Sequence, residues 1–298
     1  MPELPDIIAY QEAIQRVALG CRLVKARIYR PFLVRSIEPT VCALEGRELA
    51  SVERIGKRLA LGFGDDLFLV FHLMIAGRFL WAHQPPPKPS KSDLASFEFE
   101  SGTLVMTEAG TKRRASLYVV RGRANLAEHD RGGVDPIDGD AASFAKALTL
   151  ENRTLKRVLT NPSIFSGIGN AYSDEILFAA RLSPVRLTGS LGPEDIERLR
   201  IATRETLLHW TDVLRREFKS KFPGRGQITA FRDDFNVHGR FGEPCNDCGM
   251  PIQRIVHAEN ETNYCARCQN EDRVLADRAL SRLLKEDWPR TIEEMVGD

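Results

Sequence analysis

Four cysteines in the C-terminal part of the chain have the spacing of a metal site. Cys245 and Cys248 stand in CNDC, and Cys265 and Cys268 stand in CARC, sixteen residues further on. Each pair can place two thiolates on one metal ion, and the residues between the pairs suit a hairpin that brings them together. Two disulfides are the alternative, which a reducing compartment disfavours. The spacing therefore predicts one structural Zn²⁺, which leaves no open coordination position for a substrate.

The first residues, MPELPD, suggest a different chemistry. Removal of Met1 would leave Pro2 with a free secondary amine, and an α-amine has a pKa of about 8, against about 10.4 for a lysine. A useful fraction of that amine is unprotonated near neutral pH and can attack carbon. Glu3 is adjacent and can share the same pocket. The alternative is that Pro5 simply begins a helix, where its missing N–H does no harm.

A third group of residues suits the binding of phosphate. Gly167 and Gly169 in SGIGN allow close approach of the backbone to a ligand, and the helix that follows offers free N–H groups. Asn170 can add a side-chain donor, although it could also be an ordinary helix cap. Basic residues cluster at 112–114 with 121–123, at 153–157 and at 219–225. A zinc ribbon with basic helices indicates nucleic-acid binding.

The elements that must position these groups can be predicted from periodicity. Apolar residues at helical spacing predict a helix over residues 5–20, beginning at Pro5 and ending near Gly20. Short alternating or apolar runs between residues 21 and 120 predict a β-sandwich or barrel, with a loop at 85–91. Cys21 and Cys42 stand alone in this part, and we expect them to be buried thiols.

The pattern turns helical after the polar segment 132–140, GGVDPIDGD. Residues 193–218 form the longest helical pattern, with apolar side chains on one side, and residues 270–288 predict a further amphipathic helix. We therefore divide the chain into an N-terminal β-sandwich (1–132), a linker (133–149), a helical domain (150–230), a zinc finger (235–270) and a C-terminal helical extension (271–298).

Composition narrows the class of protein. The chain has 298 residues, of which 43% are hydrophobic and 28% charged, so wholesale disorder is not expected. No apolar run approaches the roughly 20 residues that span a bilayer. The N-terminus lacks the order of a signal peptide, which predicts a reducing, cytoplasmic location. The net charge of +1 says little about partners.

Four stretches together resemble one family. They are MPELPD, IGKRLAL with the following DLFLVFHLMIAG, SGIGNAYSDEILFAARLSP, and HGRFGEPCNDCG with HAENETNYCARCQ. In this order and spacing they resemble the Fpg/Nei family of DNA glycosylases, over about residues 1–270, and the opening is closer to the formamidopyrimidine type. The resemblance implies a multidomain α+β fold with an N-terminal β-sandwich and leading helix, a helix–two-turn–helix module and a C-terminal zinc ribbon.

The resemblance also implies an activity. It indicates a bifunctional DNA glycosylase and abasic-site lyase of base excision repair that flips damaged bases out of double-stranded DNA. Pro2 would attack C1′ of the nucleotide, Glu3 would protonate the deoxyribose ring oxygen, and Lys57 would contact phosphate and assist β-elimination. Structural zinc would be the single cofactor. The protein would act as a monomer on bacterial chromosomal DNA, away from membranes.

Residues that contact DNA follow from the same comparison. Asn170 matches the phosphate-binding asparagine, and Lys91 stands where a histidine is usual and still suits phosphate. Arg113 survives from the loop that plugs the duplex, but Ala115 stands at its aromatic position and Ile75 at the methionine wedge. A plug with so little apolar area should stabilise the vacated site less. His72 could lie near DNA or be a core histidine.

The largest departure is Asn260, where the family has an arginine on the zinc hairpin. Asparagine keeps a donor but loses the charge and the bidentate geometry, which predicts weaker phosphate binding and impaired δ-elimination. Arg254 on the same hairpin could compensate. Two alternatives stay open: a catalytically weakened damage- or structure-specific DNA-binding protein on this scaffold, and a zinc-ribbon factor without lyase chemistry.

Overall fold

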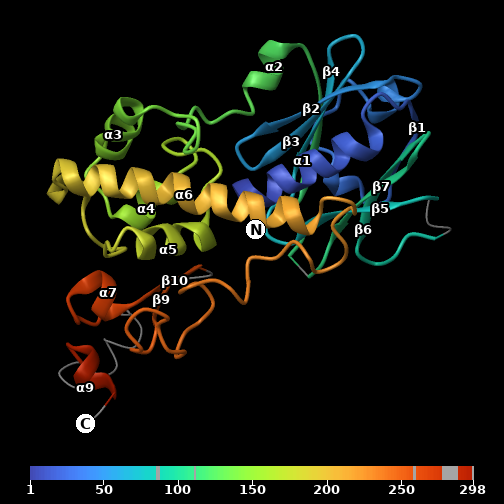
Figure 1. Cartoon of the computed structure of the whole chain (residues 1–298). Coiled ribbons are helices and arrows are strands. Elements are labelled where there is room, and N and C mark those ends of the chain that lie inside the picture. The colour runs from blue at the N-terminus through green and yellow to red at the C-terminus, as the bar shows by residue number, and fades with distance from the viewer. Residues whose placement is uncertain (85–87, 111, 258–259, 277–287, 297–298) are drawn as a thin grey trace. The chain divides into compact units, whose positions relative to one another are not determined.

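The computed structural model describes residues 1–84, 88–110, 112–257, 260–276 and 288–296 (Figure 1). The chain forms two compact units. The first comprises Met1–Arg131 and Trp210–Thr229, and the second comprises Gly132–His209 and Ala230–Asp298. No helix in the described ranges is long and apolar enough to cross a membrane.

The first unit is a β-sandwich with a leading helix, as predicted. Helix α1 (Leu4–Ala18) packs against β2 (Figure 1). One antiparallel sheet has the order β1-β6-β7-β5 and the other β2-β3-β4-β8. The strands are β1 (Leu23–Ile28), β2 (Leu49–Ile55), β3 (Arg58–Phe63), β4 (Leu67–His72), β5 (Gly77–Ala82), β6 (Asp93–Phe99), β7 (Gly102–Glu108) and β8 (Ser116–Arg121). Short 3-10 helices cover Pro31–Leu33 and Val41–Leu44, and α2 (Arg123–Ala127) follows β8.

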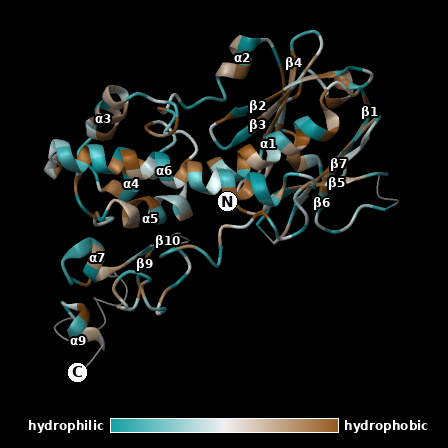
Figure 2. Cartoon of the chain, viewed as in Figure 1, coloured by the Kyte–Doolittle hydropathy of each residue, from teal (hydrophilic) through white to brown (hydrophobic). Residues whose placement is uncertain are grey.

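A large hydrophobic core stabilises this unit. It is formed by inward residues of both sheets, the buried side of α1, and Leu214 and Phe218 from the end of α6 (Pro193–Glu217). Phe71 meets Phe79 and Phe97 edge to face, at centroid distances of 5.0 and 5.3 Å. Figure 2 shows the hydrophobic colour along the strands of both sheets. Two details differ from expectation, since Cys42 is exposed and Cys21 only half-buried.

The second unit is helical, with a ribbon at its C-terminal end. Its helices are α3 (Ala141–Thr149), α4 (Leu155–Thr160), α5 (Asn170–Ala179) and the first part of α6, with a 3-10 turn at Thr188–Ser190. Helix α3 lies within residues 133–149, which the sequence analysis expects to be a linker. The side chains of Phe144 and Leu148 are buried there, and Phe144 packs on Phe165 at 4.7 Å between centroids. This segment is therefore part of the packed unit.

The ribbon consists of the hairpin β9 (Gln253–His257) and β10 (Asn260–Tyr264), followed by α7 (Ala266–Asn270). Beyond it, α9 (Ile292–Val296) places the buried Ile292 against Tyr264 and Ala266. The C-terminal extension therefore packs on the ribbon through Ile292. The amphipathic helix predicted over residues 270–288 falls mostly on 277–287, outside the described residues.

Candidate functional site

The N-terminal residues lie inside the first unit. Pro2 is buried and Glu3 is 2% exposed. Helix α1 begins at Leu4, one residue before the predicted start, and Glu3 is its N-cap. The backbone N–H of Glu3 donates to the Asp6 carboxylate at 2.9 Å. Since α1 is fixed by the core, this contact fixes the direction in which the terminus leaves the helix.

The surroundings of the terminus favour a neutral amine. Burial lowers the pKa of the Met1 α-amine below its usual value; the Glu3 carboxylate opposes this, and the cations Arg78 and Lys57 add to it. The amine in this structure belongs to Met1, and loss of that residue would put the Pro2 amine one position further into the chain. Burial of this kind favours the unprotonated form of an amine, which is the nucleophilic form.

Arg78 is a residue that the sequence analysis missed. Its guanidinium donates to the carbonyl of Ile228 at 2.6 Å and to those of Gly77 and Ile75 at 2.7 and 3.1 Å. These bonds brace the turn between β4 and β5. In that turn Met74 has a left-handed φ of +52°, and the side chain of Ile75 is 54% exposed. Ile75 therefore faces solvent, as a wedge residue should.

Lys57 and His72 lie close enough for the charge of Lys57 to act on the imidazole. Lys57 lies in the turn between β2 and β3 and is half-buried. Its neighbour Arg58 stands opposite His72 on β4. Burial, then Arg58 and Lys57, lowers the pKa of His72 to about 4. His72 is therefore a neutral imidazole at physiological pH, able to donate or accept a hydrogen bond without adding charge.

The loop before β8 carries a second cationic group. Arg113 donates to the backbone carbonyl of Lys91 at 2.6 Å, so two predicted DNA contacts lie together. Buried Glu108 accepts from the N–H groups of Arg114 and Ala115 at 2.9 and 3.2 Å. Ala115 is 0% exposed and part of the core. It therefore offers no side chain that could fill a vacated stack in a duplex.

Asn170 is the first residue of α5, after the glycine turn. Gly167 has a left-handed φ of +85°, which favours glycine, and Gly169 is the N-cap. The Asn170 side chain does not cap the helix. Instead its amide donates to the carbonyl of Glu261 on β10 at 2.8 Å. Glu175, one turn further on, accepts from the backbone N–H groups of Asn236, Val237 and His238 at 2.8, 2.8 and 3.0 Å, which is a structural role.

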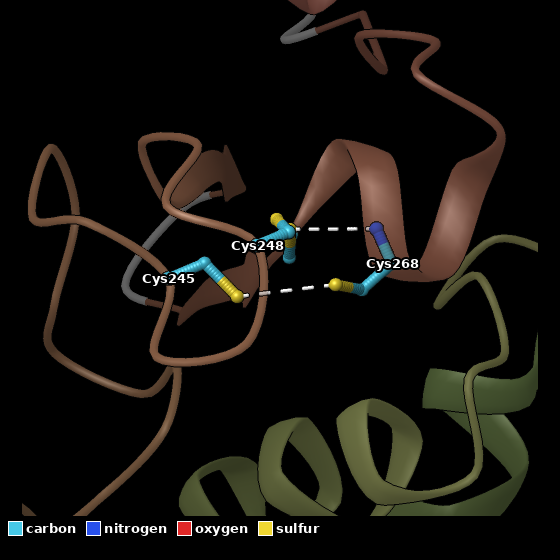
Figure 3. A group of neighbouring side chains, drawn as sticks. Cys245, Cys248 and Cys268 are labelled. Carbon is cyan, nitrogen blue, oxygen red and sulfur yellow. Dashed lines mark hydrogen bonds between the residues drawn. The ribbon is translucent and has the colours of Figure 1, made fainter.

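The four ribbon cysteines converge as the spacing predicts. Their sulfur atoms all lie within 4.8 Å of one another, and Cys245 and Cys268 point toward each other at 3.9 Å (Figure 3). Tetrahedral Zn–S bonds of about 2.3 Å place neighbouring sulfurs about 3.8 Å apart. Burial raises the pKa of the Cys268 thiol to about 11, so a bound cation is what keeps this sulfur ionised at neutral pH. The donor set fits Zn²⁺ in a structural site.

The zinc hairpin carries Asn260 at the position of the family arginine and a different arginine, Arg254, on its other strand. Asn260 begins β10 and pairs with His257 across the turn; its side chain lies outside the part that the structure describes. Arg254 on β9 stacks over the Phe241 ring at 4.5 Å and lies 3.5 Å from the Glu261 carboxylate. Arg254 is therefore engaged by its own ribbon, which makes it a poor substitute for the missing arginine.

Three family models match consecutive parts of the chain. The formamidopyrimidine-DNA glycosylase N-terminal domain matches residues 1–114, its H2TH domain matches 133–213, and the zinc finger found in FPG and IleRS matches 242–270. The chain belongs to the formamidopyrimidine-DNA glycosylase family. Its H2TH match begins at residue 133, which agrees with the packed α3 rather than with a linker.

Curated relatives and solved structures of the family agree. A formamidopyrimidine-DNA glycosylase of Heliobacterium modesticaldum is 30% identical, over 90% of this chain and 100% of the relative. One of Symbiobacterium thermophilum is also 30% identical, over 90% of this chain and 89% of the relative. The MutM (Fpg) structure of Thermus thermophilus is 28% identical, with a TM-score of 0.75 over 90% of this chain and 98% of that chain. The structure of Lactococcus lactis Fpg, solved with DNA containing an abasic site, has a similar fold. Its TM-score is 0.78 at 24% identity, over 90% of this chain and 99% of that chain.

Family membership fixes the class of reaction and the metal. The chain is a DNA glycosylase of base excision repair with abasic-site lyase activity, and its zinc finger holds a structural zinc ion. In the structure the charge of Lys57 acts on the N-terminal amine, beside Glu3. Arg113 contacts Lys91, and Asn170 contacts the zinc hairpin. The sequence analysis missed Arg78 and Asp6. Asp6 could have been recognised from the sequence, because it follows Glu3 at the spacing of a capping box.

Proposed function

We propose that Pro2, exposed by removal of Met1, is the nucleophile of this enzyme and that Glu3 is its acid. The supporting observations are that Glu3 is buried and that burial lowers the pKa of the α-amine of the chain terminus, which is the Met1 amine in this structure. The amine nitrogen bonds to C1′ of the damaged nucleotide as the base leaves with the electrons of its glycosidic bond, and the proton lost from the nitrogen goes to the departing base. Glu3 gives its proton to the ring oxygen as the sugar opens, which leaves a cationic imine. Reductive trapping tests this assignment.

The imine then supports strand cleavage. It acidifies the proton on C2′, and loss of that proton forms the C2′–C3′ double bond as the 3′ phosphate leaves with the electrons of its C–O bond. Lys57 acts on this step, beside the phosphate. The charge that Lys57 already contributes at the α-amine supports its place there. The substrates are oxidised or otherwise damaged bases, flipped from the stack at a cost of a few kcal/mol.

DNA is the partner of this enzyme, and the phosphates are bound by residues of both units. In the first unit, Lys91 and Arg113 form one contact group and His72 lies beside Lys57 and Arg58. In the second, Asn170 offers an amide at the start of α5, where the helix dipole favours an anion. We infer that the protein acts as a monomer in the bacterial cytoplasm, as the bacterial sources of its relatives suggest.

The rate of adduct formation should follow the ionisation of a depressed α-amine. Protonation removes the lone pair, so reductive trapping on abasic-site DNA rises with pH, with a midpoint below the ordinary value of about 8. Arg78→Leu removes one of the cations that lower this pKa and should move the midpoint upward. His72 adds no inflection near neutrality, because its pKa is about 4. A midpoint close to the lysine value of about 10.4 would instead assign the reaction to a side-chain amine.

Asn260 should limit both affinity and the second elimination. On an abasic-site duplex we expect mainly the β product on a denaturing gel. Asn260→Arg restores a charge-assisted contact of about 1.5–3 kcal/mol, so DNA affinity should rise at least tenfold and the β,δ product should increase. Asn125→Arg adds the same charge to an exposed position of α2 and is the matched control. A predominantly β,δ product from the unaltered chain would contradict this view of Asn260.

A further inference from the structure

A buried carboxylate in the second unit has no part in the chemistry described above. Asp174 lies on α5 and is 0% exposed. One of its oxygens, Oδ1, accepts a hydrogen bond from Nζ of Lys156 on α4 at 2.5 Å, and the Lys156 side chain is 13% exposed. A buried ion pair of this kind adds little net stability, because desolvation offsets the attraction. Its best-attested use is to fix one geometry.

The other oxygen of Asp174 reaches the segment before the ribbon and the zinc hairpin. Oδ2 lies 2.7 Å from Nδ1 of His238, which is 4% exposed, and accepts from the backbone N–H of Asn263 on β10 at 3.1 Å. Asn263 stands two residues before the zinc ligand Cys265. One carboxylate therefore joins α4, α5, the residue His238 and the hairpin strand.

The same elements meet again at Asn170. Nζ of Lys156 also donates to the backbone carbonyl of Asn170, at 2.7 Å. The side-chain amide of Asn170 donates to the carbonyl of Glu261, at 2.8 Å, and Glu261 lies two residues before Asn263 on β10. These contacts close a ring that runs from Asp174 through Lys156, Asn170 and β10 back to Asp174. The Asn170 amide has two N–H groups. Because one of them donates to the Glu261 carbonyl, the direction of the other is fixed.

We propose that Asp174 is a positioning residue for DNA binding, which holds the Asn170 amide and the β10 strand as one unit so that Asn170 meets a phosphate in a fixed orientation. The proposal rests on the phosphate-binding role proposed above for Asn170. Asp174 itself is buried and touches no DNA. It acts on one side through Lys156, which holds the Asn170 backbone, and on the other through Asn263, which holds the strand that orients the Asn170 side chain.

A double-mutant cycle tests this coupling. In Asp174→Asn the amide oxygen can still accept from Lys156, but the new NH₂ group faces the N–H of Asn263, so the hairpin side of the ring breaks. Affinity is measured by fluorescence anisotropy on a duplex with a tetrahydrofuran abasic analogue. We expect Asn170→Ala and Asp174→Asn each to weaken binding about tenfold, and Asp174→Asn to weaken it less than twofold in the Asn170→Ala background. The matched control is Asp195→Asn, which should change affinity less than twofold. Asp195 lies on α6 and pairs with Arg198 of the same helix and with Arg186, which precedes the helix.

Readouts beyond affinity separate positioning from stability. Zinc content and the thermal transition are measured for every variant, and reductive trapping at saturating DNA should stay within twofold of the parent in Asp174→Asn. Additive losses in the double variant, or an unchanged affinity in Asp174→Asn, would overturn the proposal. An Asn170→Ala variant with full affinity would instead overturn the role of Asn170 in the proposed function.

A second variant approaches the ring from its other side. Lys156→Gln keeps a donor but removes the charge and shortens the side chain, and we expect a similar loss of affinity that again disappears in the Asn170→Ala background. The Lys156→Gln variant replaces Asp174→Asn in the test if Asp174→Asn loses its zinc. Loss of the folded state in both variants would make the cluster a stability element only, and would also overturn the proposal.

Discussion

A form of the chain with extra residues ahead of Met1 will give no covalent adduct with abasic-site DNA under borohydride, whereas the form with a free Pro2 will. An amide nitrogen has no lone pair available to bond with C1′, so the extension removes the nucleophile and leaves every side chain in place. We expect adduct formation and strand cleavage to fall roughly 10³-fold or more, as for the loss of other enzymic nucleophiles. Intact mass confirms which terminus each preparation carries.

A matched variant separates the loss of the amine from damage to the pocket. Pro2→Gly, freed in the same way, keeps a terminal amine in the place of the imino nitrogen and should still form an adduct, at a reduced rate. Glu3→Gln should keep binding DNA and lose base excision, because an amide has no proton to give to the ring oxygen. If the extended form still traps DNA, the nucleophile is another amine, and Lys57 becomes the first candidate.

Loss of the zinc site should abolish specific DNA binding while the β-sandwich stays folded. Structural zinc supplies about 10–16 kcal/mol to small domains of this type, far more than the few buried apolar side chains of the ribbon core can replace. Without it, the hairpin that orients Asn170 has no fixed place. We expect Cys268→Ser to bind less zinc and to weaken binding to an abasic-site duplex by roughly 100-fold or more.

The chain supplies its own control for this experiment. Cys42 is an exposed cysteine in the first unit, far along the chain from the ribbon, so Cys42→Ser should keep zinc stoichiometry and affinity unchanged. Metal content by atomic absorption and Kd by anisotropy are compared across the two variants. A zinc-free Cys268→Ser that binds abasic-site DNA as tightly as the parent would show that the ribbon has no part in DNA binding.

Local patterns were sufficient to predict most of the elements and the zinc site. The alternation of short apolar runs predicted a β-sandwich or barrel, and the helical spacing of Leu199, Thr203 and Leu207 predicted the buried side of α6. The cysteine spacing predicted the ribbon because a knuckle is a feature of a few consecutive residues. Pro2 and Glu3 could be proposed for the same reason: a terminal amine and its neighbouring acid need no distant partner to be recognised.

Features that depend on distant contacts could not be predicted in this way. Arg78 bonds to Ile228, 150 positions further along the chain, and Asp174 bonds to Asn263, 89 positions further. No local pattern marks either pair. Ala115 could be aligned with a wedge residue, yet its burial depends on how the loop enters β8, where Glu108 holds the backbone. The glycines and aspartates of residues 132–140 predicted a boundary, and the predicted linker reached residue 149 although Phe144 and Leu148 have helical spacing. The structure shows that both of these side chains are buried.

The bonds of Arg78 have a consequence for redesign of this enzyme. The same guanidinium braces the turn that exposes Ile75 and tunes the proton affinity of the chain terminus. A library that randomises this turn to change which nucleotides are accepted would therefore also shift the pH optimum whenever it reaches position 78. A library that keeps Arg78 and varies only positions 74–76 would leave this cation in place beside the terminal amine.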